Sequence, residues 1–419
     1  MSLTRRGFLT GCSAAIAAFA GTNLNTLAFG DPGGNGGHGG GGDVLVHVFL
    51  RGGMDGLHLM PPLGGSDRAF YEEARPQLKV PTAGNAAALP LNDAFGLHPA
   101  AAPLLDLYRD GQLAIVQATG LHVPTRSHFD AMQYIELGTP GAKNEANGWL
   151  TRYLQTIGVP AEAAAPSLAV GTLRQTSLLG AERTINLDSI GGFSLNTVSW
   201  RWRPGLRTAL RQLYESGDSW RHQSGQETLN ALDLVELYAS PSYKPAHGAA
   251  YPEGEFGQRL QAVAQLIRLE LGLRVATLDF GGWDTHEGQG NGSGGYFAQL
   301  VTELARGLKA FMTDLDGHRL TLIVQSEFGR RLRQNANDGT DHGHGNLMMV
   351  LSRNIRGGIY GTWPGLDNDQ LFDRADLAVT TDYRHVLAEL LTRQLNRGGL
   401  EAVFPGLPAF EPLGLVPRG

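Results

Sequence analysis

Five apolar runs alternate with amphipathic helical patterns along this chain, and the alternation limits the folds it can adopt. The runs are rich in Val, Ile and Leu, which is typical of strands buried on both faces of a parallel sheet. They are Val44–Leu50, Gln112–Gly120, Leu273–Gly282, Arg319–Phe328 and Asn346–Ser352. Strands that alternate with helices imply right-handed βαβ crossovers. The sequence therefore predicts an α/β fold with a mostly parallel central sheet covered on both faces.

The helical patterns place apolar residues three and four positions apart, so that each helix has one apolar face. They are Phe256–Gly272, Tyr296–Leu315 and Asp382–Leu395. The chain has 419 residues, of which 42% are hydrophobic and 18% charged, as expected for a globular protein with a sizeable core. We expect one domain over residues 44–419, with a less regular insertion around residues 180–240 that forms part of it or caps it.

The N-terminus resembles a twin-arginine export signal over residues 1–30. Arg5 and Arg6 precede Phe8, Leu9 and a mildly apolar run, and the small residues of "LAFG" predict a cleavage site after Gly30. An ordinary N-terminal helix is the alternative. Export by the twin-arginine translocase would deliver the protein to the periplasm or the medium. Residues 31–43 are rich in glycine and predict a flexible linker.

Composition excludes several classes of protein and site. Cys12 is the only cysteine and would leave with the signal, so the mature chain would have no disulfide and no thiolate ligand. The net charge of −6 offers no basic footprint for nucleic acid. No later apolar run approaches the roughly 20 residues of a membrane span. The final "LVPRG" resembles a thrombin-cleavage tag but is equally compatible with a native end.

Polar, glycine-rich turns follow four of the predicted strands: "RGGMDGLH", "LHVPTRSHFD", "GGWDTHEG" and "SEFGRR" with "GTDHGHGN". Ligands of open parallel sheets bind beyond the carboxyl ends of the strands, so these turns would meet at one edge. They would bring together Asp55, His58, His122, Ser127, His128, Asp130, Asp284, His286, Glu327, Asp341, His342 and His344.

Imidazole and carboxylate groups at this density indicate a divalent metal, with zinc the ion expected. Asp284 and His286 lie two residues apart, on one side of an extended segment, and suit one ion. The adjacent Asp341 and His342 diverge at a turn, so they can serve two ions, or one ion and the groups that support its ligands. Each motif also has a structural reading: Asp55 as a turn residue, "WDTH" as an Asx-turn, and "DHGHG" as a solvated loop.

Four ordered motifs resemble those of the DUF1501 family of exported bacterial proteins. They are "RGGMDGL", "RSHFDAMQ", "FGGWDTHEGQ" and "SEFGRR…GTDHGHGN…GGIYGTWPG", and they span nearly the whole mature chain. The family is related to the alkaline phosphatase and sulfatase superfamily. The resemblance implies an alkaline phosphatase-like, three-layer α/β/α sandwich and a binuclear metal site at the strand ends. It brings no settled substrate.

The resemblance also implies roles for individual residues. Asp55 is similar to the first-strand aspartate that binds metal, Asp284 and His286 to the pair that serves one ion, and Asp341 with His342 to the Asp-His pair of the superfamily. His344 or His385 would complete the site, although neither matches by spacing. We therefore expect one or two ions held by Asp55, Asp284, His286, Asp341, His342 and His344.

The nucleophile departs from the superfamily pattern. "HVPTR", His122–Arg126, has the shape of the sulfatase signature, but a histidine stands where the modified residue should be. Ser127 is the nucleophile candidate at the start of the next helix, with helix capping as the alternative role. Arg126 or Arg330 would add donors to developing negative charge.

These observations favour an exported metal-dependent hydrolase of phosphate or sulfate esters. A non-catalytic exported binding or cell-surface protein that retains the fold is the second hypothesis. A phosphomutase-like or transferase enzyme is the third, and export argues against it because cytoplasmic phospho-metabolites would be absent.

Overall fold

The computed structural model describes residues 43–417 apart from 161–162, 164, 191–201, 239–242, 394 and 396. The predicted export signal, almost all of the glycine linker and the last two residues of "LVPRG" lie outside the described residues. Among the described residues, no helix combines the length and the apolar character that crossing a membrane requires.

The central sheet is mixed but mostly parallel, which confirms the predicted α/β class. Its strand order is β12-β4-β11-β8-β1-β7-β5-β6, with β13 beside β4. The strands are β1 (Val44–Leu50), β4 (Leu113–Gly120), β5 (Ser167–Val170), β6 (Thr184–Leu187), β7 (Val275–Phe280), β8 (Leu320–Ser326), β11 (Asn346–Leu351), β12 (Gly358–Tyr360) and β13 (Thr381–Asp382).

Strand β11 runs antiparallel to both of its neighbours, β4 and β8. After β8 the chain enters a two-stranded ribbon, β9 (Arg330–Gln334) and β10 (Thr340–His342), instead of a helix. Without a helical crossover the chain returns to the sheet in the opposite direction. The antiparallel strand is thus a consequence of the same excursion that carries Asp341 and His342.

Strand β1 lies at the centre of the sheet, between β7 and β8, and all seven of its residues are buried. Its side chains alternate between two hydrophobic clusters, because successive residues of a strand point to opposite faces. Val46 and Val48 belong to one cluster, and Leu45 and Phe49 to the other. Burial on both faces explains why this strand is a continuous apolar run.

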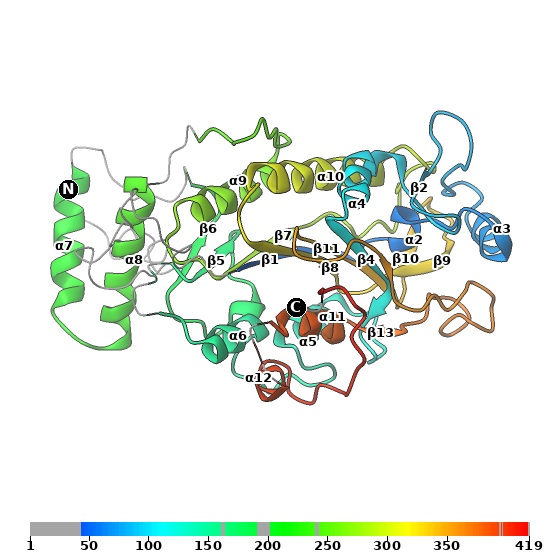
Figure 1. Cartoon of the computed structure of the whole chain (residues 1–419). Helices are drawn as coiled ribbons and strands as arrows, with labels where there is room; N and C mark the ends of the chain where they lie inside the picture. Colours follow the sequence, from blue (N-terminus) through cyan, green and yellow to red (C-terminus); the bar gives the residue numbers. More distant parts are fainter. Residues whose placement is uncertain are drawn as a thin grey trace.

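Helices pack against both faces of the sheet (Figure 1). One cluster takes in residues of α4 (Ala102–Arg109), α9 (Glu255–Arg268) and α10 (Tyr296–Asp314). The other takes in residues of α5 (His128–Leu137), α6 (Trp149–Ile157), α11 (Tyr383–Leu391) and α12 (Arg397–Val403). Helix α9 ends at Arg268, four residues before the glycine at which the sequence predicts its end.

The predicted insertion is mostly helical where the structure describes it. Helices α7 (Arg203–Glu215) and α8 (Trp220–Tyr238) form a hairpin whose small core contains Leu210, Leu229 and Leu232. This hairpin lies beyond β6, at the end of the molecule opposite β9 and β10 (Figure 1). Shorter elements lie at the β9–β10 end: α2 (Gly56–Leu59), α3 (Gly65–Ala74), and the pair β2 (Leu89–Pro90) and β3 (Gly96–Leu97).

Candidate metal centre

The turns after β1, β4, β7 and β8 meet at one edge of the sheet. Strands β1, β7 and β8 are mutually parallel, and β4 runs in the same direction because β11 is antiparallel to both β4 and β8. His128 follows β4, Asp284 follows β7, and His342 lies in the ribbon after β8. One ligand atom from each of these three residues lies within 4.8 Å of the others.

The separations within this cluster suit a metal ion. Asp284 Oδ1 lies 3.3 Å from His128 Nε2 and 3.2 Å from His342 Nε2. Ligand atoms placed about 2.0 Å from a tetrahedral zinc ion are roughly 3.3 Å apart. Asp284 is thus already near the spacing from both histidines that a single ion would impose.

His286 brings a fourth candidate donor to the same place. Its Nε2 lies 3.2 Å from Asp284 Oδ1 and 2.8 Å from His342 Nε2. Its side chain is 42% exposed, whereas that of His128 is 20% exposed. His286 therefore stands on the solvent side of the cluster.

Hydrogen bonds at the Nδ1 atoms determine which ring nitrogens face the cluster. His342 Nδ1 donates to the carbonyl of Arg126 at 2.8 Å, and a carbonyl can only accept. His128 Nδ1 donates to Glu327 Oε1 at 2.7 Å, and its Nε2 is buried without a hydrogen-bond partner. Both rings consequently direct Nε2 toward Asp284, and in the neutral form of each ring this nitrogen carries a lone pair. Several lone pairs that converge on one carboxylate oxygen repel each other unless a cation lies among them.

The charges of the cluster also suit a cation. Partial burial opposes ionisation of Asp284, but the hydrogen bond and charge of Arg330 outweigh it and lower the pKa of Asp284 to about 2. Burial lowers the pKa of His342, which favours its neutral, metal-binding form. The hydrogen bond to Glu327 raises the pKa of His128, so a proton competes with a metal ion for its Nε2.

Two fully buried charged residues support the ligands. Arg330 donates to Asp284 Oδ1 at 2.6 Å, to the carbonyl of Gly53 at 2.6 Å and to that of Thr340 at 2.7 Å. Glu327 accepts from His128 and from the backbone N–H of Gly52 at 2.8 Å. Burial alone would raise the pKa of Glu327, but these and neighbouring hydrogen bonds hold it below its usual range.

Three predicted ligands, Asp284, His286 and His342, lie together, and Asp341 lies just behind them. Asp341 Oδ1 is 3.1 Å from His286 Nδ1 and accepts from Asn335 Nδ2 at 3.0 Å. His342 thus faces the His128–Asp284–His342 cluster, whereas the adjacent Asp341 contacts His286.

Two other predicted ligands lie outside the cluster. Asp55 is buried, and its carboxylate accepts from Arg75 at 2.7 and 3.0 Å and from Gln289 at 2.8 Å. His344 is buried with its ring 4.3 Å from that of Phe372. His385, the other residue proposed to complete the site, stacks on Phe410.

The two predicted catalytic residues directly precede His128 in the sequence. Ser127 is the N-cap of α5, and its Oγ accepts from the backbone N–H of Asp130 at 3.4 Å. The Arg126 guanidinium pairs with Asp376 at 2.5 Å and with Asp373 at 3.1 Å. The contact that Arg126 makes with the cluster is through its carbonyl, which holds His342.

His128 and Glu327 are the functional candidates that the sequence did not assign. Both stood among the polar residues expected at this edge, but "RSHFD" was interpreted as a helix cap beside a nucleophile. One sequence feature could have identified His128 as a site residue: it begins the helix that follows a strand, and the end of that strand lies near the other motifs. Its partner Glu327 is 199 residues away in the chain, so the pair is visible only in three dimensions.

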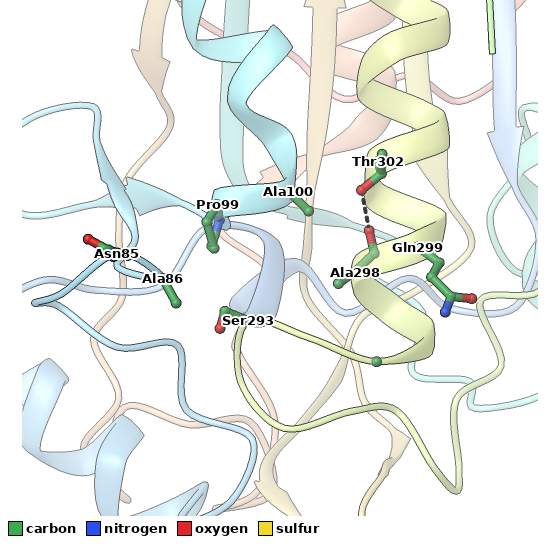
Figure 2. Close-up of a pocket in the computed structure, with 9 residues that line it drawn as sticks. Asn85, Ala86, Pro99, Ala100, Ser293, Ala298, Gln299 and Thr302 are labelled. Atoms are coloured by element: carbon green, nitrogen blue, oxygen red, sulfur yellow. Dashed lines mark hydrogen bonds between the residues drawn. The ribbon is translucent and has the colours of Figure 1, made fainter.

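An open pocket lies elsewhere, at the start of α10 (Figure 2). Its lining has no charged side chain, and the Thr302 hydroxyl donates to the carbonyl of Ala298 at 2.7 Å. The lining residues are Asn85, Ala86, Pro99, Ala100, Ser293, Gly295, Ala298, Gln299 and Thr302. The pocket shares no residue with the His128–Asp284–His342 cluster, so we place the candidate site at the cluster.

The fold and this cluster together define an α/β protein with a candidate metal centre at the ends of its parallel strands. Residues 43–403 match the family model described as "Protein of unknown function (DUF1501)", and the chain belongs to that family. No curated protein matches the sequence.

Proposed function

We propose that this protein is an exported metal-dependent hydrolase of phosphate or sulfate esters, with an alkaline phosphatase-like, three-layer α/β/α fold. The observation that carries the proposal is the convergence of His128, Asp284 and His342 at ligand spacing, with the His128 Nε2 buried and without a hydrogen-bond partner. The four motifs resemble the DUF1501 family, and the relation of that family to the alkaline phosphatase and sulfatase superfamily supports the reaction class. The twin-arginine pattern supports export to the periplasm or the medium.

We propose zinc as the ion, because it takes imidazole nitrogen and carboxylate oxygen readily. His128, Asp284 and His342 would hold one ion, and His286 is near enough to contribute. A bound divalent ion supplies Lewis acidity that polarises a phosphoryl or sulfuryl oxygen. The close mutual contact of all four donors favours one ion at this position.

The residues of the chain would perform three tasks around the ion. Arg330 keeps Asp284 ionised and oriented. The N-terminus of α5, which carries His128, is electrostatically positive and attracts an anionic ester. Ser127, at that same terminus, remains the candidate nucleophile; its Oγ accepts the capping bond, and its hydroxyl also hydrogen-bonds the Asp130 carboxylate. Arg126 could bind the substrate only if its pairs with Asp376 and Asp373 opened.

The position of His286 beside the cluster favours the non-catalytic alternative. If His286 Nε2 coordinates together with the other three donors, four protein ligands complete a tetrahedral set. Structural zinc sites are closed in this way, whereas catalytic sites keep a position for water or substrate. The number of coordinating side chains therefore separates the hydrolase from a binding protein.

Metal analysis of the purified mature protein tests the proposal, beside an Asp284→Ala/His342→Ala variant. We expect stoichiometric metal in the wild type and none in the variant. The loaded wild type should then hydrolyse members of a panel of phosphate and sulfate monoesters. A folded wild type that takes up no metal would exclude the hydrolase. A metal-loaded protein that is silent on the whole panel would favour the binding protein.

A further inference from the structure

Glu327 is a buried carboxylate that contacts the candidate metal centre through His128, at the ring nitrogen that does not face Asp284. Its side chain has no exposed surface. One oxygen, Oε1, accepts from His128 Nδ1 at 2.7 Å and from the backbone N–H of Gly52 at 2.8 Å. The other oxygen, Oε2, lies 2.9 Å from the Ser326 hydroxyl. A buried carboxyl group is costly to desolvate unless it is hydrogen-bonded, and both oxygens of Glu327 have hydrogen-bond partners here.

The backbone turn that contacts Glu327 also contacts Arg330. Gly52 donates to Glu327, while Arg330 donates to the carbonyl of Gly53. Arg330 in turn holds Asp284. The turn is closely packed, because a Cβ on Gly52 would lie 2.4 Å from the backbone nitrogen of Asp284. One short turn thus connects the residue that supports His128 with the residue that supports Asp284.

We infer that Glu327 is the positioning residue that makes His128 a metal ligand, by holding the proton on Nδ1 and directing the Nε2 lone pair at the ion. The Gly52–Gly53 turn holds Glu327 and Arg330 in fixed positions relative to each other. His128 and Asp284 therefore lie at ligand spacing before an ion binds. This inference rests on the metal binding in the proposed function and is independent of ester hydrolysis.

Carboxylates that hold the distal nitrogen of a ligating histidine raise ligand basicity and fix ring orientation, and their loss weakens metal binding about 10- to 100-fold. Glu327→Gln removes the charge and leaves the size of the side chain nearly unchanged. We expect the affinity of the metal-free protein for Zn²⁺, measured by competition with a chelating dye, to fall by about that factor. The visible absorption of the Co²⁺-loaded variant should also change, because its ligand field depends on His128.

A double-mutant cycle separates positioning from a general structural role. If Glu327 acts through His128, Glu327→Gln should cause no further loss of affinity in a His128→Ala background. Asp314→Asn is the matched control. Asp314 is another buried carboxylate, which accepts from Tyr243 and Tyr251, and it lies at the end of α10 that leads into the opposite edge of the sheet. This control should lose stability and keep the Zn²⁺ affinity of the wild type.

The outcomes distinguish this inference from the proposed function. A wild type that binds no metal overturns the proposed function and the inference with it. A wild type that binds Zn²⁺, with Glu327→Gln equal to it in affinity and Co²⁺ spectrum, overturns the inference alone. If Glu327→Gln does not fold, Glu327→Asp takes its place, because the shorter carboxylate keeps its charge and should still weaken binding. Equal losses with and without His128 would assign Glu327 a general structural role instead.

Discussion

The candidate metal centre contains two carboxylate–histidine pairs that differ in their surroundings. Glu327–His128 lies at the sheet edge, with the carboxylate fully buried. Asp341–His286 lies between the ribbon and the turn after β7, with both side chains more than 40% exposed. Both pairs direct an imidazole toward Asp284. The first is held by the sheet and its buried turn, whereas water can replace part of the second, so the buried pair should dominate metal affinity.

Removal of one of the two histidines should have the largest effect on Zn²⁺ affinity. We expect His128→Ala to reduce Zn²⁺ affinity about a hundredfold or more, since a structural zinc site shares roughly 10–16 kcal/mol among four ligands. His286→Ala should cost about tenfold or less, because its side chain is exposed and solvent can take its place. Competition titrations on the metal-free proteins measure both values. Equal losses would contradict the ranking and indicate a closed four-ligand site.

Substitution in the Gly52–Gly53 turn, which contacts Glu327, should have the next largest effect. Gly52 has φ of +121°, and an added Cβ would meet Asp284 N, so Gly52→Ala combines backbone strain with a clash. We expect a loss of about 2–4 kcal/mol in the free energy of unfolding, together with weaker Zn²⁺ binding. Denaturant titration of the metal-free protein measures the first effect.

Gly84→Ala is the control for this change, because Gly84 also has a positive φ, of +86°, but open space around it. It should show the cost of the backbone conformation alone and leave metal binding intact. If the two variants lose the same stability, the close approach between Gly52 and Asp284 has no energetic weight.

A third histidine shows what burial does without a supporting carboxylate. His47 lies in β1 with its ring near Phe49 and Trp149. Burial, with the charge of Arg51 as a smaller cause, lowers the pKa of His47 to about 3. The unfolded chain takes up this proton near pH 6.5, so the stability that neutral His47 provides is complete above that pH. It is lost as the pH falls from about 6.5 toward 3.

The expected slope is up to about 1.4 kcal/mol of unfolding free energy per pH unit for this one group. His47→Leu should flatten the pH dependence between pH 6.5 and 4.5 by up to that amount. His58 and His98, whose pKa values burial also lowers, would still contribute to the pH dependence of the unfolding free energy in this variant. Denaturant titrations at several pH values measure the slope. An unchanged slope in the variant would show that His47 is not neutral in the folded protein.

The sequence predicted the parts of the fold that depend on local pattern. Val44–Leu50 was predicted with its observed bounds, because a strand buried on both faces is an uninterrupted apolar run. The four-residue strands β5 and β6 were not predicted, since "SLAV" and "TINL" are too short to stand out. The direction of β11 depends on the ribbon before it, whose charged sequence resembles a loop.

The convergence of side chains was predicted where they follow strand ends directly, and their contacts were predicted less well where a distant partner decides them. Asp284, His286 and His342 converge as expected. Asp55 was expected to bind metal, but Arg75 engages both of its oxygens. His128 gains its orientation from Glu327, which no local pattern connects with it. Long-range pairing of charged groups is therefore the information that a single sequence lacked.

The smallest expected effect is that of the exposed pair itself. Asp341→Asn keeps an oxygen that can accept from His286 Nδ1 and from Asn335 Nδ2, but it removes the charge. We expect Zn²⁺ affinity to fall only about three- to tenfold, at the low end of the range for groups that support a ligand. The charge is partly screened by solvent, because Asp341 is 48% exposed. Competition titration beside Glu327→Gln measures the contrast. A larger loss for Asp341→Asn than for Glu327→Gln would reverse the ranking of the two pairs and return Asp341 to the role of a direct ligand.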